Sequence, residues 1–540
     1  MPLTSRLSAF FSFSLWLERI LKHPRKVISG ISVITLFFAW QLSHLSFATS
    51  VYDLVIENIP ETVQYNEFKK LFGSDEIIRI VVKGADVFEA ATFDKVARIS
   101  EEASRIKGVR RIISLPGIKK EIDISGRLSL EDFVSRIRPV ELFRKNLISD
   151  DGRSTSLTLV LSEDANRHAV IEAVNQLLKN ESQGLATYQI GIPLVSEALS
   201  SLTKTDFCRL PPLSMLLFAG ILFVLYRHVN CIVVPLLCIV VALVWTFGLM
   251  SICKIPLSML TMMVPIFLMA IGIAYCLHIC SEYMAFSRTD RDPAEVVRLT
   301  FYGIAFPTFL TVFTTIIGFA SLWINRITAI REFAFFSSFG LISILMVLFT
   351  LFPAVLSLLP TPQPSATTRV KHFFQRMIQQ IIRLNLNRQH VTLPIIGAIS
   401  ILCIAGIFRI EVETNPLGYL KADSPVSRNF HDIYQDLSGS FPLNVVMEGS
   451  DSNYFENPSH IRQISELQKR LTTLSGVDKT VSFADYLMLV NYAINQFDPR
   501  YYAIPDEAIE VRMLVNNYKI LLGDDMLKRF MSPDFSRANV

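Results

Sequence analysis

Seven stretches of apolar residues, each long enough to cross a lipid bilayer, constrain this chain more than any other feature. A helix needs about 20 mostly apolar residues to cross roughly 30 Å of hydrocarbon. The first stretch follows basic residues, as a signal peptide does, but its apolar core is too long for one. We therefore expect an integral membrane protein whose seven spans, the first an uncleaved anchor, lie near residues 27–47, 210–227, 231–252, 256–280, 300–324, 333–359 and 391–408.

The composition agrees with this expectation. Hydrophobic residues make up 51% of the 540 residues and charged residues only 19%, which is more apolar than a soluble domain of this size. The net charge of +4 is small for the length and gives no bulk attraction to nucleic acid. All seven cysteines lie inside or at the edge of apolar stretches without metal-ligand spacing, so we expect no disulfide framework, metal or cofactor.

The placement of Lys and Arg in short loops predicts which ends of the spans face the cytoplasm. Four basic loops lie on one side, and a single loop, with Arg326 and Arg331, disagrees. The four include Arg227 and His228 between spans two and three, and Arg288, Arg291 and Arg298 after span four. Both long polar regions are therefore predicted to face away from the cytoplasm.

These boundaries predict an order of domains. We expect two amphipathic cytoplasmic segments, because apolar and basic residues alternate at helical spacing in both. The predicted order is the amphipathic N-terminus (1–26), span one (27–47), an extracytoplasmic porter-like α+β domain (48–209), spans two to six (210–360), an amphipathic linker (361–390), span seven (391–408) and an incomplete second extracytoplasmic domain (409–540).

The two polar regions are similar to each other, with a period of about 365 residues. Four positions in the first region recur in the second at offsets of 366, 367, 368 and 368. These pairs are Gly73 and Gly439, Phe88 and Phe455, Gly108 and Gly476, and Ser114 and Ser482. An internal duplication of this kind is typical of transporters, whose pathways form between repeats.

Each copy has the pattern of a strand, a helix and a strand. The predicted elements are 77–82, 93–106 and 109–115 in the first copy, and 443–448, 460–473 and 477–483 in the second. The first copy continues with strand 154–162, helix 167–178, strand 187–192 and helix 194–206, which together would build a small α+β sheet domain. The sequence at Asp534 resembles that at Asp151, where this continuation begins. We therefore expect one piece of a longer or split protein, or a truncated gene product.

Span five carries a sequence rich in threonine and glycine that resembles a known family. It runs from Pro307 to Leu322, contains Thr314-Thr-Ile-Ile-Gly318-Phe319, and is followed by Ile330-Arg-Glu-Phe333 and Gly340. This resembles the pattern of the resistance-nodulation-cell division (RND) superfamily, in its mycobacterial-membrane-protein-large (MMPL) and hydrophobe exporter branch. Spans two to six also resemble the sterol-sensing domain of Patched and Niemann-Pick type C proteins.

The resemblance implies a fold and a function. The fold would be an α-helical membrane protein with α+β extracytoplasmic domains: a six-span RND repeat, with the large domain after span one, and the start of a second repeat. The function would be export of lipids, hopanoids or other amphiphiles from a bacterial inner membrane. In the family, proton flow through acidic residues in spans four and ten commonly drives it.

Span four departs from the family pattern Gly-x-Asp-Tyr-x-x-His. Here the sequence is Gly272-Ile-Ala274-Tyr275-Cys-Leu-His278, so Ala274 stands where the aspartate would be. A proton relay needs a titratable group at membrane depth. His278 and Glu282, four residues apart on one helix face, are the remaining candidates. The alternative is that both lie at the cytoplasmic end of the span and reach to the interface.

The threonines of span five have two possible roles. Thr308, Thr311, Thr314 and Thr315, with Gly318, either line a pathway or coordinate a polar group, or they allow close packing of helices in lipid. Tyr275 of span four is a further transport candidate. The outer regions carry no catalytic constellation, so we expect no enzyme. The leading hypothesis is transport of a hydrophobic or lipid-like molecule, with the missing half supplied by a second chain or by self-association. The alternatives are a non-transporting lipid-binding or sensing protein, and a truncated remnant.

Overall fold

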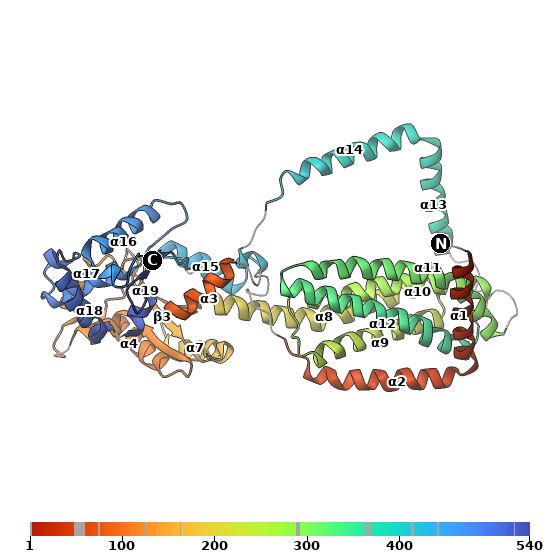
Figure 1. The fold of residues 1–540 in the computed structure, drawn as a ribbon, viewed down its shortest axis with the longest axis horizontal. Helices are drawn as coiled ribbons and strands as arrows, with labels where there is room; N and C mark the ends of the chain where they lie inside the picture. Colours follow the sequence, from red (N-terminus) through yellow and green to blue (C-terminus); the bar gives the residue numbers. More distant parts are fainter. Residues whose placement is uncertain are drawn as a thin grey trace. The chain divides into compact units, whose positions relative to one another are not determined.

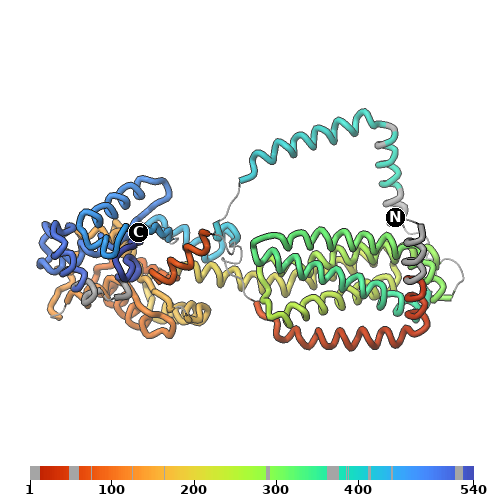
Figure 2. Tube along the Cα trace, in the orientation of Figure 1, coloured from red at the N-terminus to blue at the C-terminus, as the bar shows by residue number. Residues whose placement is uncertain are grey.

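A computed structural model describes residues 3–47, 60–73, 76–123, 126–162, 164–287, 292–361, 369–411, 415–439, 442–522 and 524–540. The chain divides into two compact units (Figures 1 and 2). The membrane unit comprises Met1–Glu57 and Ser200–Thr414, and the sheet unit comprises Asn58–Leu199 and Asn415–Val540. Within the sheet unit we call the segment before Leu199 the first copy and the segment after Asn415 the second copy. Arg288 and Arg291 of the topology prediction lie outside the described residues.

Seven of the described helices are long and apolar enough to cross a membrane, which confirms the seven predicted spans. In the bundle of Figure 1, α12 contacts α2, α9, α10 and α11. The helices of this unit are α1 (Leu3–Lys22), α2 (Pro24–Gln41), η1 (Leu42–His44), α8 (Ile192–Tyr226, which begins in the sheet unit), α9 (Asn230–Ile252), η3 (Thr261–Met263), α10 (Val264–Phe286), α11 (Pro293–Ser321), η4 (Leu322–Ile324), α12 (Thr328–Leu358), α13 (Arg369–Asn387) and α14 (Gln389–Ile407).

The core of the bundle consists of apolar side chains, as expected of helices that pack against one another in lipid. Leu341, Val347 and Phe352 of α12 are fully buried in it. Helix α1, which comes before α2 in the chain, packs on this core through Leu17. Its Glu18 forms an ion pair with Arg298 of α11 at 2.6 Å. The N-terminal segment is therefore a helix that covers one end of the bundle.

Two predicted spans differ from the helices observed. Span four was predicted from residue 256, but α10 begins at Val264 because Ser258 and Thr261 form a turn, in which the Ser258 N–H donates to Thr261 Oγ1 at 2.8 Å. The predicted break between helix 194–206 and span two is also wrong, since α8 is continuous through Pro211 and Pro212. Proline is tolerated in membrane helices when neighbouring groups satisfy the freed carbonyls.

The first copy folds as an antiparallel sheet in the order β2-β3-β1-β4. This is the split β-α-β arrangement of ferredoxin-like domains, and α4 and α7 cover one face, on which Ile78, Ile80 and Val82 are buried. The elements are α3 (Pro60–Phe72), β1 (Ile77–Lys83), α4 (Ala90–Ser104), β2 (Val109–Ile113), α5 (Leu115–Ile122), α6 (Leu130–Ile137), β3 (Ser154–Leu161), α7 (Arg167–Glu181) and β4 (Ala186–Ile190).

The second copy repeats the start of this sheet in the same register. Lys83 pairs with Ser154 in the first copy, and Glu448 pairs with Arg537 in the second. The elements are η5 (Pro416–Tyr419), α15 (Pro425–Asp436), β5 (Val446–Glu448), η6 (Tyr454–Glu456), α16 (Pro458–Leu471), α17 (Phe483–Ile494), η7 (Pro499–Tyr501), α18 (Ala508–Leu522), α19 (Asp524–Phe530) and β6 (Arg537–Asn539). The duplication seen in the sequence is therefore also a duplication of strand pairing.

The predicted strand 477–483 is wrong. Among the described residues this segment has no regular structure before α17 begins at Phe483. In the first copy the equivalent strand, β2, pairs with residues Thr158–Leu161 of β3. Among the described residues no strand pairs with segment 477–483, and an extended segment needs a main-chain partner to form part of a sheet.

Candidate functional site

One face of α10 is exposed along the length of the helix. The exposed residues follow one another at intervals of three or four, which places them on a single stripe. They are Phe267, Ala270, Ala274, His278, Ser281 and Ala285. The opposite face, with Tyr275, Cys276 and Ile279, is buried in the bundle. Most side chains of the stripe are small, and small residues allow another helix to approach closely in lipid.

His278 and Glu282 lie on or beside this stripe, at the end of α10 nearer Phe286. At about 1.5 Å per residue, His278 lies about 12 Å from that end and Glu282 about 6 Å from it. Glu282 is half-buried, and a Cβ added at Gly303 of α11 would lie 3.7 Å from its Oε1. Within the part of the chain that the structure describes, the two side chains form no ion pair with each other.

The threonines of α11 bond mainly to their own helix. Thr311 donates to the carbonyl of Pro307 at 2.9 Å, and Thr315 donates to the carbonyl of Thr311 at 2.8 Å. Thr314 donates to the same carbonyl at 2.9 Å. The Thr315 hydroxyl also lies 3.4 Å from that of Tyr275, so this pair of the candidate residues is brought together across α10 and α11. Thr311 and Thr314 are exposed, whereas Thr308 is buried.

The motif glycines divide into packed and open positions. A Cβ at Gly340 would lie 2.3 Å from Leu268 Cδ1, and one at Gly272 would lie 3.1 Å from Ile239 Cγ1. These two glycines therefore allow close contact between helices. Gly318 differs, because no described atom lies within 4 Å of its Cβ position, although the neighbouring Phe319 packs on Phe333 with a ring separation of 5.8 Å. Gly318 belongs to the exposed surface of α11.

In the sheet unit, a polar cluster that was not predicted from the sequence joins the first-copy sheet to α15. Lys83 Nζ lies 2.6 Å from both Asp432 and Asp436, and the Tyr188 hydroxyl donates to Asp432 at 2.6 Å. Burial disfavours the charge on Lys83, but the hydrogen bonds to both carboxylates outweigh it and raise the pKa of Lys83. The available signal was the pair of cations on β1, Arg79 and Lys83, which lie on the strand face opposite Ile78, Ile80 and Val82.

Arg79 is the buried member of this sheet face. Its guanidinium donates to the carbonyls of Ser438, Gly439 and Asn146, and to the hydroxyl of Ser156 at 3.0 Å. Burial lowers the pKa of Arg79 to about 10, so the group remains charged at neutral pH. Arg79 therefore connects main-chain groups of both copies without using a carboxylate of the cluster.

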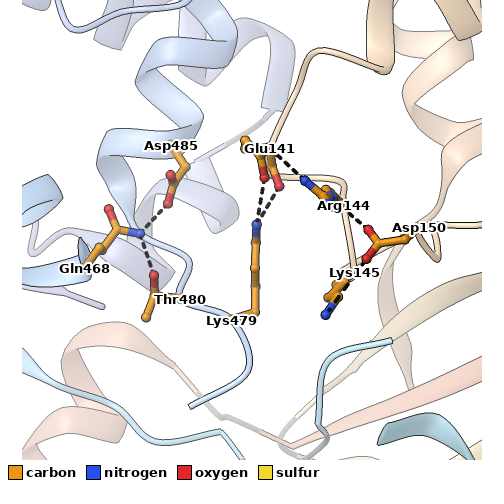
Figure 3. A network of polar contacts seen from close by, with 8 residues as sticks. All are labelled: Glu141, Arg144, Lys145, Asp150, Gln468, Lys479, Thr480 and Asp485. Carbon is orange, nitrogen blue, oxygen red and sulfur yellow. Dashed lines mark hydrogen bonds and ion pairs between the residues drawn. The ribbon is translucent and has the colours of Figure 1, made fainter. Parts of the chain in front are cut away.

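A second network also joins the copies (Figure 3). Lys479 donates to the carbonyl of Glu141 at 2.7 Å, and Arg144 Nε contacts Asp150 at 2.6 Å. Gln468 donates to Asp485 at 2.6 Å, and burial raises the pKa of the Asp485 carboxyl. Lys479 and Asp485 belong to the second copy and the Glu141–Asp150 segment to the first, so Lys479 provides the direct contact between them.

An apolar cavity of about 250 Å³ lies between the copies. Helix α5 and the segment after α6 line it from the first copy, and α17 lines it from the second. Its apolar lining comprises Ile112, Ile113, Ile118, Ile122, Leu142, Phe143, Leu147, Tyr486, Leu489, Val490, Ala493, Ile494 and Phe497, and Arg111 and Glu121 also contact it. Both copies are needed to enclose it.

Comparison with known proteins identifies the family. A family model described as the MMPL family matches residues 63–384, more than half of the chain. The chain belongs to the MMPL family. A membrane protein of Methanocaldococcus jannaschii is similar to it at 19% identity over 356 residues, which cover 62% of this chain and 90% of that relative. MMPL membership confirms the expected RND-type, largely helical membrane fold, and the general function of the family is transport of hydrophobic substrates.

The region matched by the MMPL model has a clear extent in the structure. It contains α8–α12 and the first-copy sheet, and therefore all of the candidate residues from Gly272 to Gly340. Residues 385–540, with α14 and the second copy, lie outside the match. In this MMPL protein the second copy is related to the first by its strand pairing, since Glu448 pairs with Arg537 as Lys83 pairs with Ser154.

Proposed function

We propose that this MMPL protein exports or traffics a hydrophobic or lipid-like molecule, and that the exposed face of α10 and α11 is where its membrane unit meets a second repeat. The observation that carries the proposal is the stripe itself. His278, Glu282 and Thr311 lie on helices whose composition places them in a bilayer, yet the bundle leaves them at least partly uncovered. Polar and ionisable side chains inside a bilayer are more stable beside protein or water than in hydrocarbon, so a partner that covers this face would stabilise it.

The second repeat would come from another chain or from a second copy of this one. The small residues Ala270, Ala274 and Gly318 leave room for a close helix–helix contact. The location that we propose is a bacterial inner membrane, with the sheet unit on the side away from the cytoplasm, as the positive residues of the loops predict. Energy coupling would then depend on His278 and Glu282, while Tyr275 and Thr315 form a separate pair between α10 and α11.

A second candidate function follows from Ala274. This exposed position carries a methyl group where the family pattern has a carboxylate. Without that acid the same helices would bind or sense a lipid without moving it. The two candidates differ in whether His278 and Glu282 matter for movement of the lipid.

The test begins with the native complex, purified in mild detergent and weighed by mass spectrometry together with its extracted lipids. A complex with a second repeat and an enriched lipid supports the proposal. Reconstitution of that complex into vesicles then measures lipid transfer. We expect His278→Ala and Glu282→Gln to slow transfer by at least about tenfold, whereas Thr350→Val on α12 should leave it within about twofold.

Two results would contradict transport. One is a lone monomer with no enriched lipid. The other is a complex that retains its lipid but transfers it equally fast with and without His278 and Glu282, or not at all. Retention without transfer favours the sensing function.

A further inference from the structure

The apolar cavity between the copies has a buried end and an exposed end. Leu142, Leu147 and Val490 line it and are at most 2% exposed. Glu121 and Ile494 line it as well, and their side chains are 41% and 44% exposed. Glu121 lies in the last turn of α5, and Ile494 is the last residue of α17. The cavity therefore reaches the surface between the ends of these two helices.

An ion pair lies at this opening. Arg111 of β2 donates from Nη2 to Glu121 Oε1 at 3.3 Å. Burial disfavours the charge on Glu121 more than Arg111 favours it, so the pKa of the Glu121 carboxyl is raised. A guanidinium can hold a carboxylate by two parallel and shorter hydrogen bonds. Arg111 would therefore bind a carboxylate in that geometry more strongly than it binds Glu121.

The turn after α17 is strained where it meets the cavity. Gln496 and Phe497 have positive φ, at 59° and 62°, which is uncommon for large side chains. The Phe497 N–H donates to the carbonyl of Tyr492 at 2.9 Å, and the Arg136 guanidinium lies 4.6 Å from the centre of the Phe497 ring. These contacts keep Phe497 in the cavity lining against the preference of its backbone. Residues held in this way are concentrated at binding and catalytic sites.

The volume of the cavity limits the ligand. An apolar protein cavity of about 150 Å³ stays dry and binds benzene, which has six carbon atoms. By the same ratio, the 250 Å³ found here would hold about ten carbon atoms. One hydrocarbon chain of medium length fits this volume, whereas the two long chains of a phospholipid do not.

We propose that this cavity binds a medium-chain fatty acid of about ten carbons, with its chain between α5 and α17 and its carboxylate on Arg111 in place of Glu121. The inference names the hydrophobic molecule of the proposed function and so rests on it. Charge favours an acid over an amine, because Lys119 and Lys120 lie in the same turn of α5 as Glu121. Each methylene covered by the apolar lining increases the affinity about fourfold.

The probe is decanoate with a photoreactive diazirine in its chain, added to the full protein in lipid nanodiscs. After illumination, mass spectrometry identifies the labelled peptides. Unlabelled carboxylates from hexanoate to hexadecanoate compete at measured free concentrations. We expect label on α5 and α17, and competition that strengthens about fourfold per methylene up to decanoate and no further. Hexadecanoate also represents the acyl chains of bilayer lipids.

One pair of variants tests the cavity. Ala493→Leu places a larger side chain in it, whereas Ala97→Leu changes an equally half-buried alanine of α4 that does not line it. We expect Ala493→Leu to weaken decanoate binding by at least about tenfold, because the added carbons take the place of about two methylenes of the ligand. Ala97→Leu should leave binding within about twofold. Hydrogen exchange of α17 checks that the fold is kept.

A further variant tests recognition of the carboxylate. Arg111→Gln should weaken decanoate binding about tenfold, the equivalent of one hydrogen bond to a charged group. The same variant should bind the uncharged 1-decanol within about twofold of the parent chain, since the lining of the chain is unchanged. An equal loss for decanoate and 1-decanol would overturn the role of Arg111 as the carboxylate site.

The outcomes separate this inference from the proposed function, because binding needs no transport. Label on α5 and α17 that Ala493→Leu and Arg111→Gln both reduce supports the site, whether or not lipid transfer is found. Label confined to the membrane spans would overturn it, and so would hexadecanoate that competes as well as decanoate. A complex that transfers lipid without label on the sheet unit would overturn this inference and leave the proposed function standing.

Discussion

The two copies in the sheet unit share their turns but not their sheets. In the first copy, Ser149 donates to Asp151 at 2.6 Å, and the Ser154 N–H donates back to Ser149 Oγ at 2.9 Å. The second copy has the same contacts at the same distances, from Ser532 to Asp534 and from Arg537 N–H to Ser532. The first turn leads into a four-stranded sheet and the second into a two-stranded one. Local turn chemistry is thus kept in both copies, and each turn leads into one antiparallel strand pair.

The helix caps are shared as well, although their partners differ. Ser114 caps α5 and lies 2.7 Å from Ser100, while Ser482 caps α17 and donates to Gln468 at 2.8 Å. The side chain that contacts the other copy is not kept. Lys83 of the first copy is replaced by Glu448 at the equivalent position of the second. Positions that fix the backbone are retained, and positions that face the other copy are not.

The largest expected difference between the copies is at Arg79. Arg79→Met should lower the free energy of unfolding of the sheet unit by about 3–5 kcal/mol, because it leaves buried carbonyls of both copies without donors. Asn444→Met, at the equivalent half-buried position of the second copy, should cost less than about 1 kcal/mol. Hydrogen exchange of the strand amides in the full chain measures both. Similar losses of unfolding free energy for Arg79→Met and Asn444→Met would contradict the argument from burial.

The next difference concerns two glycines with positive φ, Gly108 at 101° and Gly476 at 94°. Alanine at either position is strained by about 1–2 kcal/mol. At Gly108 its Cβ would also lie 3.1 Å from Ala165 and Val170, whereas nothing described lies within 4 Å at Gly476. Gly108→Ala should therefore destabilise by about 2–3 kcal/mol and Gly476→Ala by about 1 kcal/mol. The same hydrogen-exchange measurement applies, and a larger loss at Gly476 would contradict the crowding argument.

The smallest effect is the pH dependence of the second turn. Hydrogen bonds from the Ser532 and Ser536 hydroxyls lower the pKa of Asp534 from 3.8 to about 2. Because the folded pKa lies below the unfolded one, the stabilisation is complete above about pH 4 and is lost as the pH falls towards 2. The carboxylate is exposed, so the contribution is less than about 1 kcal/mol.

Asp534→Asn should remove this dependence for the Arg537 amide, measured by hydrogen exchange between pH 2 and 4. The first turn provides the control, since the Ser149 hydroxyl lowers the pKa of Asp151 in the same way. Loss of pH dependence at both turns would show a global effect of the substitution instead.

The elements that the sequence predicted correctly are those determined by local pattern. Apolar length predicted the seven spans, and β1 and α7 follow from alternation and helical periodicity. The failures have two causes. Segment 477–483 pairs with no described strand, and strand pairing is a non-local condition, whereas α10 starts late because Ser258 and Thr261 first close a local turn.

For the candidate site, spacing placed His278 and Glu282 near one face of span four. It could not show which face the bundle leaves exposed, because packing of α9, α11 and α12 decides that. The polar cluster of Lys83 with Asp432 and Asp436 could not be predicted from the sequence either, because its members are about 350 residues apart and only the fold brings them together. Roles for these residues stay predictions.

The uncovered stripe of α10 also affects the steady-state abundance of this protein in a cell. On the proposed assembly, a chain made without its partner presents His278 and Glu282 to hydrocarbon and leaves the small residues beside them without a neighbouring helix. That state is less stable than the assembled one by the cost of exposing those groups. Proteases and chaperones act on such differences of a few kcal/mol. The amount of this chain should therefore follow the amount of its partner, and synthesis of the two would need to be matched.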